Sequence, residues 1–379
     1  MNLWKRIGTV PASAVGLAVV GLLIGVAASL LAWWGNPPNM GICVACFERD
    51  VAGAIGLHRF APAQYLRPEV PAFVLGALLA ALAFGEFKPR GGTAPMARFL
   101  LGAFAMIGAL VFLGCTWRAF LRLAGGDGSA LGGLAGLVVG VAVGALFLRL
   151  GYTLGAPRPV PALAGLAGPA VMVLLLGLLL LEVSFQSGGA VFASARGPGA
   201  LHAPIAVSLI AGLLMGFLGQ RSRFCTIGGI RDAVLIRNAR LLGGAAAMTL
   251  GALAANLVLG QFRAAAAGMP IAHSDHLWNF LSMALAGLAF CLAGGCPGRQ
   301  LFLCGEGSTD ASVFVTGTIV GAAVAHNWAL AGAPDKTVLG VLRVGGPGPY
   351  GKAAVIAGLV FCVALGLTAR PRKGRGESN

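Results

Sequence analysis

The sequence predicts an all-α polytopic membrane protein with about ten transmembrane helices in two inverted repeats, each with two short re-entrant segments. Of its 379 residues, 58% are hydrophobic and 10% are charged, whereas about 25% are charged in an average soluble domain. Uncharged apolar runs recur along the whole chain. Short segments that carry cysteine and arginine lie between these runs, and their motifs repeat.

The first apolar run, residues 12–34, is expected to be a retained helix. It follows Lys5 and Arg6, as the core of a signal peptide would. However, it is longer than the roughly 7–15 residues of such a core, and it ends in Trp33-Trp34 without a small-residue cleavage site. We therefore count it as the first span.

Further apolar runs along the chain are long enough to be predicted as spans. Pro157, Pro159 and Pro161 mark the connector before the fifth span, and "GGPGPYGK" marks the connector before the last. The further expected spans are 69–87, 96–114, 130–150, 165–185, 200–219, 240–260, 277–295, 310–331 and 351–369.

An even number of spans places both termini on one side of the membrane. The connections on that side carry more basic residues than those on the other, which indicates the cytoplasm. The net charge of +15 follows from this distribution, and bases spread between apolar spans argue against a nucleic-acid partner. The basic residues on the predicted cytoplasmic side are Lys5, Arg6, Lys88, Arg90, Arg98, Arg149, Arg158, the arginines of 221–240, Arg299, Arg370, Arg372, Lys373 and Arg375.

Four stretches between the spans are too short or too polar to cross the membrane, and we expect them to be re-entrant. In two of them a cysteine, Cys43 or Cys225, is followed after five residues by an Arg-Asp pair. The stretches are 41–58, 114–124, 222–237 and 295–305.

The other two stretches share a second motif. "GCTWRAFL" and "GCPGRQLF" both read Gly-Cys-x-x-Arg. Cys115 follows Cys43 by 72 residues, and Cys296 follows Cys225 by 71. Two matching motifs at matching spacing predict an internal duplication.

Each half of the chain contains span, short segment, span, span, short segment, span. The extra span at 165–185 puts an odd number of crossings before the second half, which we therefore expect to be inverted. Irregular backbone at membrane depth persists only where protein or water surrounds it, so the short segments should meet near the middle. The predicted units are 1–150 (first repeat, four spans and two re-entrant segments), 151–199 (connector with one extra span), 200–331 (second, inverted repeat) and 332–379 (last span and basic cytoplasmic tail).

Charged residues in the re-entrant segments are expected to hold these segments in place. A charge inside a bilayer costs about 3 kcal/mol or more unless it is paired or hydrated. Adjacent Arg-Asp neighbours can neutralise one another; the alternative is a positive lining that attracts an anion. The residues assigned to support are Arg49, Asp50, Arg118, Arg231, Asp232 and Arg299.

Six cysteines are candidates to line a path for a soft solute. Thiols at the start of short helices lie beside N–H groups that favour anions, and sulfur is soft and polarisable. Sulfur or selenium in a low oxidation state would suit such a path, whereas Cys291 and Cys362 lie within apolar spans and are assigned to packing. The candidates are Cys43, Cys46, Cys115, Cys225, Cys296 and Cys304.

The spacing Cys43-x-x-Cys46 also fits a redox or zinc site. No thioredoxin-like βαβ pattern surrounds it, and zinc would need further ligands, of which His58 is nearest in sequence. A membrane thiol oxidoreductase using this pair is the alternative to a permease, and a structural or partner-anchoring role is the third hypothesis. The sequence contains no catalytic triad, phosphate loop or nucleotide motif, so we expect no enzyme activity, metal or cofactor. The other histidines, expected near the membrane interface, are His202, His273, His276 and His326.

Four stretches resemble the YeeE/YedE family of sulfur and selenium membrane transporters, and the resemblance covers most of the chain. The second and third resemble the YedE-like branch, which is associated with selenium metabolism. The stretches are "GICVACFERDVAGAIGLHR", "GCTWRAFLRLAGGDGSALGG", "GQRSRFCTIGGIRDAVLIRN" and "AGGCPGRQLFLCGEGSTDA".

The resemblance implies a permease in the bacterial inner membrane, with both termini cytoplasmic, that imports a selenium compound or a thiosulfate-like anion. The YeeE branch imports thiosulfate along cysteines of short, broken helices. By position this implies a path along Cys43 or Cys46, Cys115 and Cys296, with Cys225 completing the symmetry. The resemblance also implies a small thiol-bearing sulfur carrier as a cytoplasmic partner, in addition to membrane lipid.

Overall fold

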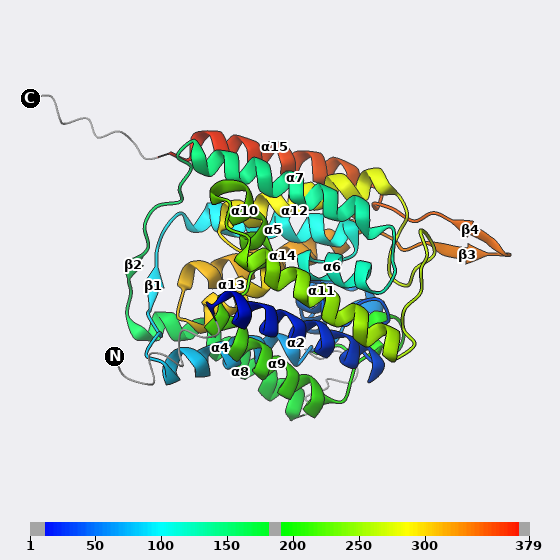
Figure 1. Cartoon of the computed structure of the whole chain (residues 1–379), viewed down its shortest axis with the longest axis horizontal. Helices are drawn as coiled ribbons and strands as arrows, with labels where there is room; N and C mark the ends of the chain where they lie inside the picture. Colours follow the sequence, from blue (N-terminus) through cyan, green and yellow to red (C-terminus); the bar gives the residue numbers. More distant parts are fainter. Residues whose placement is uncertain (1–11, 182–190, 371–379) are drawn as a thin grey trace, which may run out of the picture.

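The computed structural model describes residues 12–181 and 191–370, and it is built almost entirely from helices (Figure 1). The predicted all-α polytopic class is confirmed. Lys5, Arg6, the last residues of the fifth predicted span and the basic tail beyond residue 370 lie outside the described residues. The helices are α2 (Ala14–Trp33), α3 (Val44–Ala54), α4 (Glu69–Ala83), α5 (Pro95–Phe112), α6 (Thr116–Ala124), α7 (Ala130–Arg149), α8 (Ala162–Leu180), α9 (Ile205–Ser222), α10 (Thr226–Ile236), α11 (Arg240–Val258), α12 (His276–Ala293), α13 (Pro297–Gly305), α14 (Thr309–Asn327) and α15 (Gly351–Thr368). The other elements are η2 (Ala61–Ala63), η3 (Pro198–Ala200), and the antiparallel pairs β1 (Arg90–Gly91) with β2 (Arg158–Pro159) and β3 (Lys336–Val338) with β4 (Val341–Arg343).

Among the described residues, eight helices are long and apolar enough to cross a membrane. Three of them are counted together with the short helix that follows: α5 with α6, α9 with α10, and α12 with α13. Each predicted span coincides with a helix, but α4 and α14 are not among the eight. The helix α4 has 15 residues, fewer than the roughly 20 that cross a bilayer. The helix α14 has polar residues at both ends, which lower its hydropathy.

Contacts between the connecting segments divide these segments into two groups at opposite ends of the molecule (Figure 1). At the β1–β2 end, β1 pairs with β2, and the amide of Lys88 donates to the carbonyl of Glu306 at 3.0 Å. At the β3–β4 end, Asn39 donates to the carbonyl of Pro270 at 3.1 Å. With ten crossings, successive connections must alternate between the two sides of the membrane, and the observed groups do so. The helices α4 and α14 therefore also run from one end of the molecule to the other. The β1–β2 end comprises 84–94, 150–161, 223–225, 237–239 and 306–308, and the β3–β4 end comprises 34–43, 55–68, 125–129, 191–204, 259–275 and 328–350.

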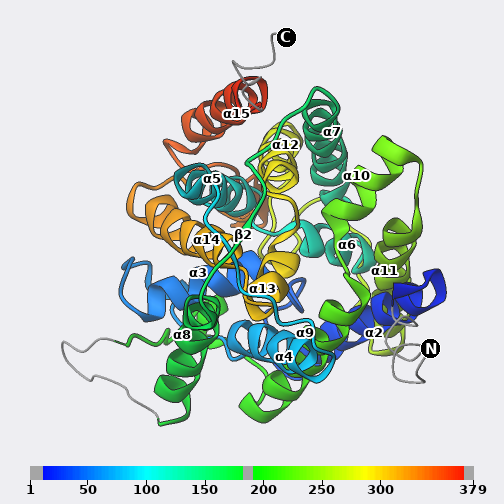
Figure 2. The same cartoon turned by 90° about the vertical axis from the view of Figure 1, so that its left-hand side faces the viewer.

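The long helices pack in four pairs that follow the predicted duplication. The pair α7–α12 corresponds to α14–α5, and α2–α11 corresponds to α9–α4, when each helix is replaced by its counterpart in the other repeat. Figure 2 views the pairs nearly end-on and shows the short helices α6 and α13 between them. Because an exchange of repeats maps the packing onto itself, an approximate two-fold axis relates the halves. The exact limits of the two repeats stay a prediction.

Two helices outside this scheme, α8 and α15, lie at the periphery (Figure 2). The helix α8 packs on α4, and α15 packs on α12 and α5. Only 22% of the 18-residue apolar stretch of α8 is buried, and only 28% of that of α15. Lipid therefore has to cover most of the surface of these two helices.

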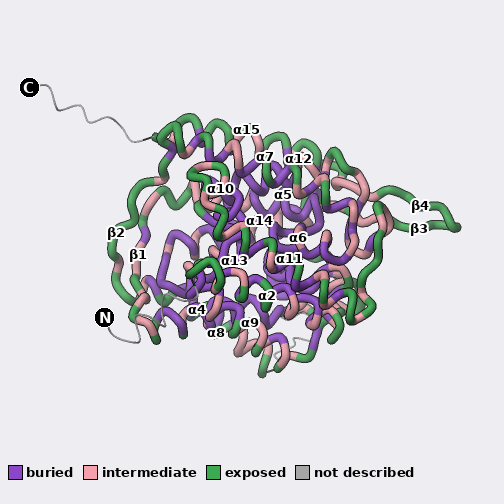
Figure 3. The backbone as a smooth tube through the Cα atoms, in the orientation of Figure 1, coloured by how far each residue is buried: buried purple, intermediate pink, exposed green. Residues whose placement is uncertain are grey.

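The first repeat holds its re-entrant helix more deeply than the second. All 11 residues of α3 are buried, whereas burial in α10 ends at Ile230. Figure 3 accordingly shows intermediate and exposed residues along α10. The segment that begins at residue 191 covers the end of α3, because Phe192 donates its amide to the carbonyl of Ala54 at 2.7 Å. The two repeats thus differ in solvent access although they share one packing scheme.

Glycines allow the paired helices to approach closely, which is the role expected of small residues in membrane bundles. A Cβ on Gly140 of α7 would lie 2.1 Å from the carbonyl oxygen of Ala284 in α12. In the equivalent pair, a Cβ on Gly317 of α14 would lie 2.2 Å from the carbonyl oxygen of Phe99 in α5. Neither contact can be relieved without moving backbone.

We expect Gly140→Ala to reduce the free energy of unfolding by about 1–3 kcal/mol, because the added methyl group overpacks a backbone contact. Gly177→Ala in α8 is the matched control, since its Cβ would meet nothing within 4 Å. This second change should be neutral or stabilising by up to about 1 kcal/mol, the helix-propensity gain of alanine over glycine. Denaturant-induced unfolding in mild detergent measures both, and equal effects would contradict the close approach of α7 and α12.

Candidate functional site

A cysteine occupies the N-cap position of each of the four short helices, and in α3, α10 and α13 its sulfur accepts a hydrogen bond from a helix amide. The first amides of a helix lack carbonyl partners, and an N-cap side chain can accept from them. Cys43 Sγ accepts from the amide of Cys46 at 3.4 Å, and Cys225 Sγ accepts from that of Gly228 at 3.2 Å. An equivalent bond of 3.4 Å forms at the start of α13. The caps are Cys43 (α3), Cys115 (α6), Cys225 (α10) and Cys296 (α13).

The motif Gly-Cys-x-x-Arg shapes the breaks before α6 and α13. Leu113 and Gly294 end the preceding helices in the left-handed region, with φ of 64° and 93°. A Cβ at Gly114 or Gly295, the next residue in each case, would lie 2.9 or 3.0 Å from the side chain of the arginine four residues later. Glycine at these positions therefore lets each arginine fold back against the break.

The four caps meet in two pairs, one from each repeat. The amide of Cys115 donates to Cys43 Sγ at 3.3 Å, and the amide of Cys296 donates to Cys225 Sγ at the same distance. The thiols within each pair also interact directly. Cys225 is 5% exposed and the other three are fully buried. The structure thus brings together the two capping cysteines of each repeat, Cys43 with Cys115 and Cys225 with Cys296.

Thr116, Trp117 and Thr226 fill the space between the two pairs. The hydroxyl oxygens of Thr116 and Thr226 are 2.9 Å apart, which joins α6 of the first repeat to α10 of the second. The indole of Trp117 lies beside the Cys296 thiol, and its ring centroid is 5.5 Å from that of Phe224. Sequence reasoning missed these residues, although each threonine directly follows a capping cysteine.

The remaining two candidate cysteines have different surroundings. Cys46 lies within the first turn of α3, and Arg118 points a guanidinium nitrogen at its sulfur at 3.8 Å. Cys304 lies near the far end of α13, with its sulfur 3.3 Å from the hydroxyl of Ser312. Cys46 therefore joins the first thiol pair, whereas Cys304 joins neither pair.

The arginines of the second motif bind backbone and acidic groups around the breaks. Arg118 donates to the carbonyls of Asn39 at 3.0 Å and Ile271 at 2.9 Å, and also to that of Leu113. Its counterpart in the second repeat is Arg299, which pairs with Glu306 at 2.9 Å. These contacts agree with a supporting role, and they tie the re-entrant segments to the connections at each end.

The Arg-Asp pair of the first repeat is part of a larger buried network. Asp50 binds Arg49 at 2.6 Å and Arg67 at 2.8 Å, and all three side chains are at most 4% exposed. The equivalent pair, Arg231 with Asp232 at 2.8 Å, is 27% and 22% exposed. Arg67 was not predicted, because it lies outside both motifs and reaches Asp50 only through the fold.

Arginine exceeds carboxylate at the β1–β2 end. Glu306 binds Arg90 at 3.0 Å in addition to the arginine of α13, and Glu86 binds Arg221 at 2.9 Å and Arg223 at 3.2 Å. Burial alone would raise the pKa of Glu86, but hydrogen bonds from Gln220 and Arg221 and the neighbouring arginine charges lower it below its ordinary value. The result is an ionised, net positive cluster close to α13.

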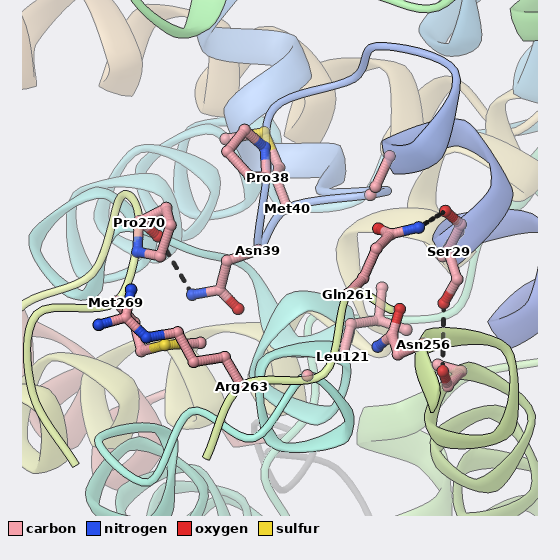
Figure 4. Close-up of a pocket in the computed structure, with 15 residues that line it drawn as sticks. Ser29, Pro38, Asn39, Met40, Leu121, Asn256, Gln261, Arg263, Met269 and Pro270 are labelled. Atoms are coloured by element: carbon pink, nitrogen blue, oxygen red, sulfur yellow. Dashed lines mark hydrogen bonds between the residues drawn. The ribbon is translucent and has the colours of Figure 1, made fainter. Parts of the chain in front are cut away.

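A cavity of about 200 Å³ opens at the β3–β4 end (Figure 4). Asn39, Asn256, Gln261 and Arg263 supply polar groups to its wall, and Gly41, two residues before Cys43, also lines it. Guanidinium and amide N–H groups can donate to an oxyanion. The side-chain amide of Asn39 already donates to Asp127 and Pro270, and those of Asn256 and Gln261 each donate to a backbone carbonyl. The cavity therefore offers polar contacts near the first thiol pair.

Comparison with known protein families finds a match in the second half of the chain. Residues 221–373 match a protein-family model described as sulphur transport. The thiosulfate transporter TsuA of Escherichia coli (strain K12) is 34% identical over 103 residues, which are 26% of this chain and 28% of that relative. These matches cover less than half of this chain and 28% of that relative, so the place of this chain in the YeeE/YedE family stays a prediction. Its assignment to the selenium branch stays a prediction.

The match to the family model includes the caps of α10 and α13 but begins after the first repeat. The cap bonds and packing pairs described above supply the corresponding features in the first repeat. Within the described residues, no three His, Cys, Asp or Glu side chains are arranged to hold a metal ion. The groups of the candidate site that could contact a solute are the thiols, the helix amides and the arginines.

Proposed function

We propose that the protein is a member of the YeeE/YedE family and an inner-membrane permease that imports a small sulfur-containing anion along its buried cysteines. The observation that carries the proposal is the meeting of four cysteine-capped helices in two thiol pairs. Each pair offers polarisable sulfur next to helix amides, a combination that suits a soft anion. The name of the relative, a thiosulfate transporter, supports the same class of solute.

The proposed route begins in the cavity at the β3–β4 end. It continues past Cys43, Cys46 and Cys115 to Cys296 and Cys225, and leaves at the arginine-rich β1–β2 end. The thiols and Trp117 are buried in this conformation, so passage requires the contacts around Trp117 to open. Contacts along the route must be weak and reversible, because a conducting path has to release its solute.

The proposed permease has a defined orientation, solute and partner. The β1–β2 end and both termini lie in the cytoplasm, because the connections at this end carry more basic residues than those at the other end. The solute is thiosulfate-like, with reduced selenium species sharing its soft character. A small thiol-bearing carrier collects the solute at the β1–β2 end. No bond of the solute has to form or break along the route, so the protein acts as a permease and not as an enzyme.

Uptake of labelled thiosulfate and labelled selenium compounds into proteoliposomes tests the proposal. We expect the wild-type protein to take up at least one of them, and Cys115→Ala to take up at least about tenfold less, equivalent to about 1.4 kcal/mol of lost interaction. Cys362→Ala is the matched control, since Cys362 is equally buried but lies in the peripheral helix α15.

A well-folded wild-type protein that takes up none of these solutes would overturn the proposal. Reversible formation of a disulfide between Cys43 and Cys46, together with electron transfer and no uptake, would instead support the thiol oxidoreductase. Unchanged uptake by Cys115→Ala would remove the thiols from the route.

A further inference from the structure

Glu48 is a buried carboxyl group to which the route described above assigns no role. It lies in the middle of α3 and is 1% exposed. Within the described part of the chain it forms no ion pair, and its Oε2 atom has no hydrogen-bond partner. The hydroxyl of Thr318 in α14 is its polar neighbour. An unpaired carboxylate is very costly in such surroundings, so the group is held in its neutral, protonated form.

Glu48 differs from the other buried acids in its partners, although the Oε2 atom of Glu69 also has no hydrogen-bond partner among the described residues. Asp50, Asp127 and Glu306 each bind at least one arginine. Glu69 has no arginine partner, but one of its oxygens accepts from Asn36 at 3.0 Å and from Ser208 at 2.9 Å. Glu69 also lies in the first turn of α4, where the helix dipole favours a negative charge.

The neighbours of Glu48 leave its charge uncompensated. The elements packed against α3 are α4, α5, α13, α14 and η2. None of the cations on them, or on α3 itself, forms an ion pair with Glu48 in the described ranges. The titratable and charged side chains on these elements and the adjoining loop are Cys46, Arg49, Asp50, His58, Arg59, Tyr65, Arg67, Glu69, Arg98, Arg299, Cys304, Asp310 and His326.

Polar groups extend from Glu48 toward both ends of the molecule. Toward the β3–β4 end, the rings of His58 and His326 are 4.7 Å apart, and His326 Nε2 is buried without a partner among the described residues. Toward the β1–β2 end, Cys304 lies within electrostatic range of Glu48 and contacts Ser312. A proton on Glu48 therefore has titratable or hydroxyl groups on either side of it.

We propose that Glu48 takes up one proton from the β3–β4 end and releases it toward the β1–β2 end in each transport cycle, so that the anion moves together with a proton. The carboxylate gains the proton and becomes a neutral carboxylic acid, and it returns to the carboxylate when the proton leaves. This inference rests on the permease function proposed above. It also gives anion import a driving force, because a proton carried in the same direction offsets one negative charge against an inside-negative potential.

The test measures proton and solute movement in the same proteoliposomes. A pH-sensitive dye is trapped inside, and labelled thiosulfate is added outside. We expect the interior to acidify with solute uptake in the wild type and in Glu69→Gln, the matched control, but not in Glu48→Gln. An acidic exterior should likewise speed uptake by the first two proteins and not by Glu48→Gln.

Two further measurements separate failure of this inference from failure of the proposed function. Exchange of labelled for unlabelled anion at equal concentrations needs no net proton movement, so it reports whether Glu48→Gln still moves solute. Infrared difference spectra of wild type against Glu48→Gln at neutral pH should contain the carbonyl band of one protonated carboxylic acid, whether or not the protein transports anything.

Acidification by Glu48→Gln during uptake, or uptake by the wild type without acidification, would overturn the inference. A missing carboxylic-acid band at neutral pH would do the same. If the wild type moves no solute at all, the proposed function fails, and the infrared band still decides whether Glu48 holds a proton.

Discussion

Replacing Cys43 by serine is expected to slow anion uptake at least about tenfold, while the free energy of unfolding stays within about 1 kcal/mol of the wild type. A serine hydroxyl can accept the amides of Cys46 and Cys115 that now bind the thiol at 3.4 and 3.3 Å. The helix cap and the joint with α6 therefore persist. What disappears is the soft, polarisable atom that the proposed solute would meet.

Two companion variants make this result interpretable. Cys43→Ala removes the cap as well, so it should also cost about 0.5–2 kcal/mol of stability. Cys362→Ser in α15 should leave uptake unchanged. If Cys43→Ser transports as fast as the wild type while Cys43→Ala is unstable, the thiol serves only as a helix cap. Uptake assays and denaturant unfolding of the same preparations decide between these outcomes.

The change Asp50→Asn should destabilise the protein by about 3–5 kcal/mol, the range found when one partner of a buried ion pair is removed. The carboxylate of Asp50 lies between Arg49 at 2.6 Å and Arg67 at 2.8 Å, all of them buried. Asparagine keeps the size of the side chain but leaves two guanidinium charges without an anion. Denaturant unfolding in detergent measures the loss.

The second repeat provides the control for this prediction. Asp232→Asn alters the equivalent pair, whose side chains are 22% and 27% exposed. Water can solvate the remaining arginine, so this change should cost about 1 kcal/mol or less. A loss of similar size in both variants would mean that solvent exposure does not determine the strength of these pairs.

Local sequence predicted the parts of the fold that depend on local pattern. Apolar runs located the helices, and the repeated cysteine motifs located the four caps, because a helix start depends on a few consecutive residues. The run at 69–87 was predicted four residues too long, since α4 ends at Ala83. Beyond that residue, Phe84 and Phe87 are apolar but belong to the connection at the β1–β2 end.

Partners that meet only in three dimensions escaped prediction. Arg67 lies 17 residues after Asp50 and reaches it because the loop after α3 folds back. Trp117 was visible only as one residue of a motif, yet it packs against Phe73, Phe224 and Phe302 from three other segments. The unpaired state of Glu48 depends on what surrounds α3 on every side. These features are set by packing between distant segments, which one sequence does not encode in a local pattern.

The unequal burial of α3 and α10 has a consequence for how the molecule opens. Local unfolding is easiest where few apolar contacts are lost and backbone already meets solvent. That description fits the second half of α10, whereas α3 is enclosed along its whole length. Fluctuations should therefore admit water first at the end where α10 enters. We therefore expect a stiff half and a yielding half in the duplicated architecture, with the yielding half at the β1–β2 end, where the proposed route ends.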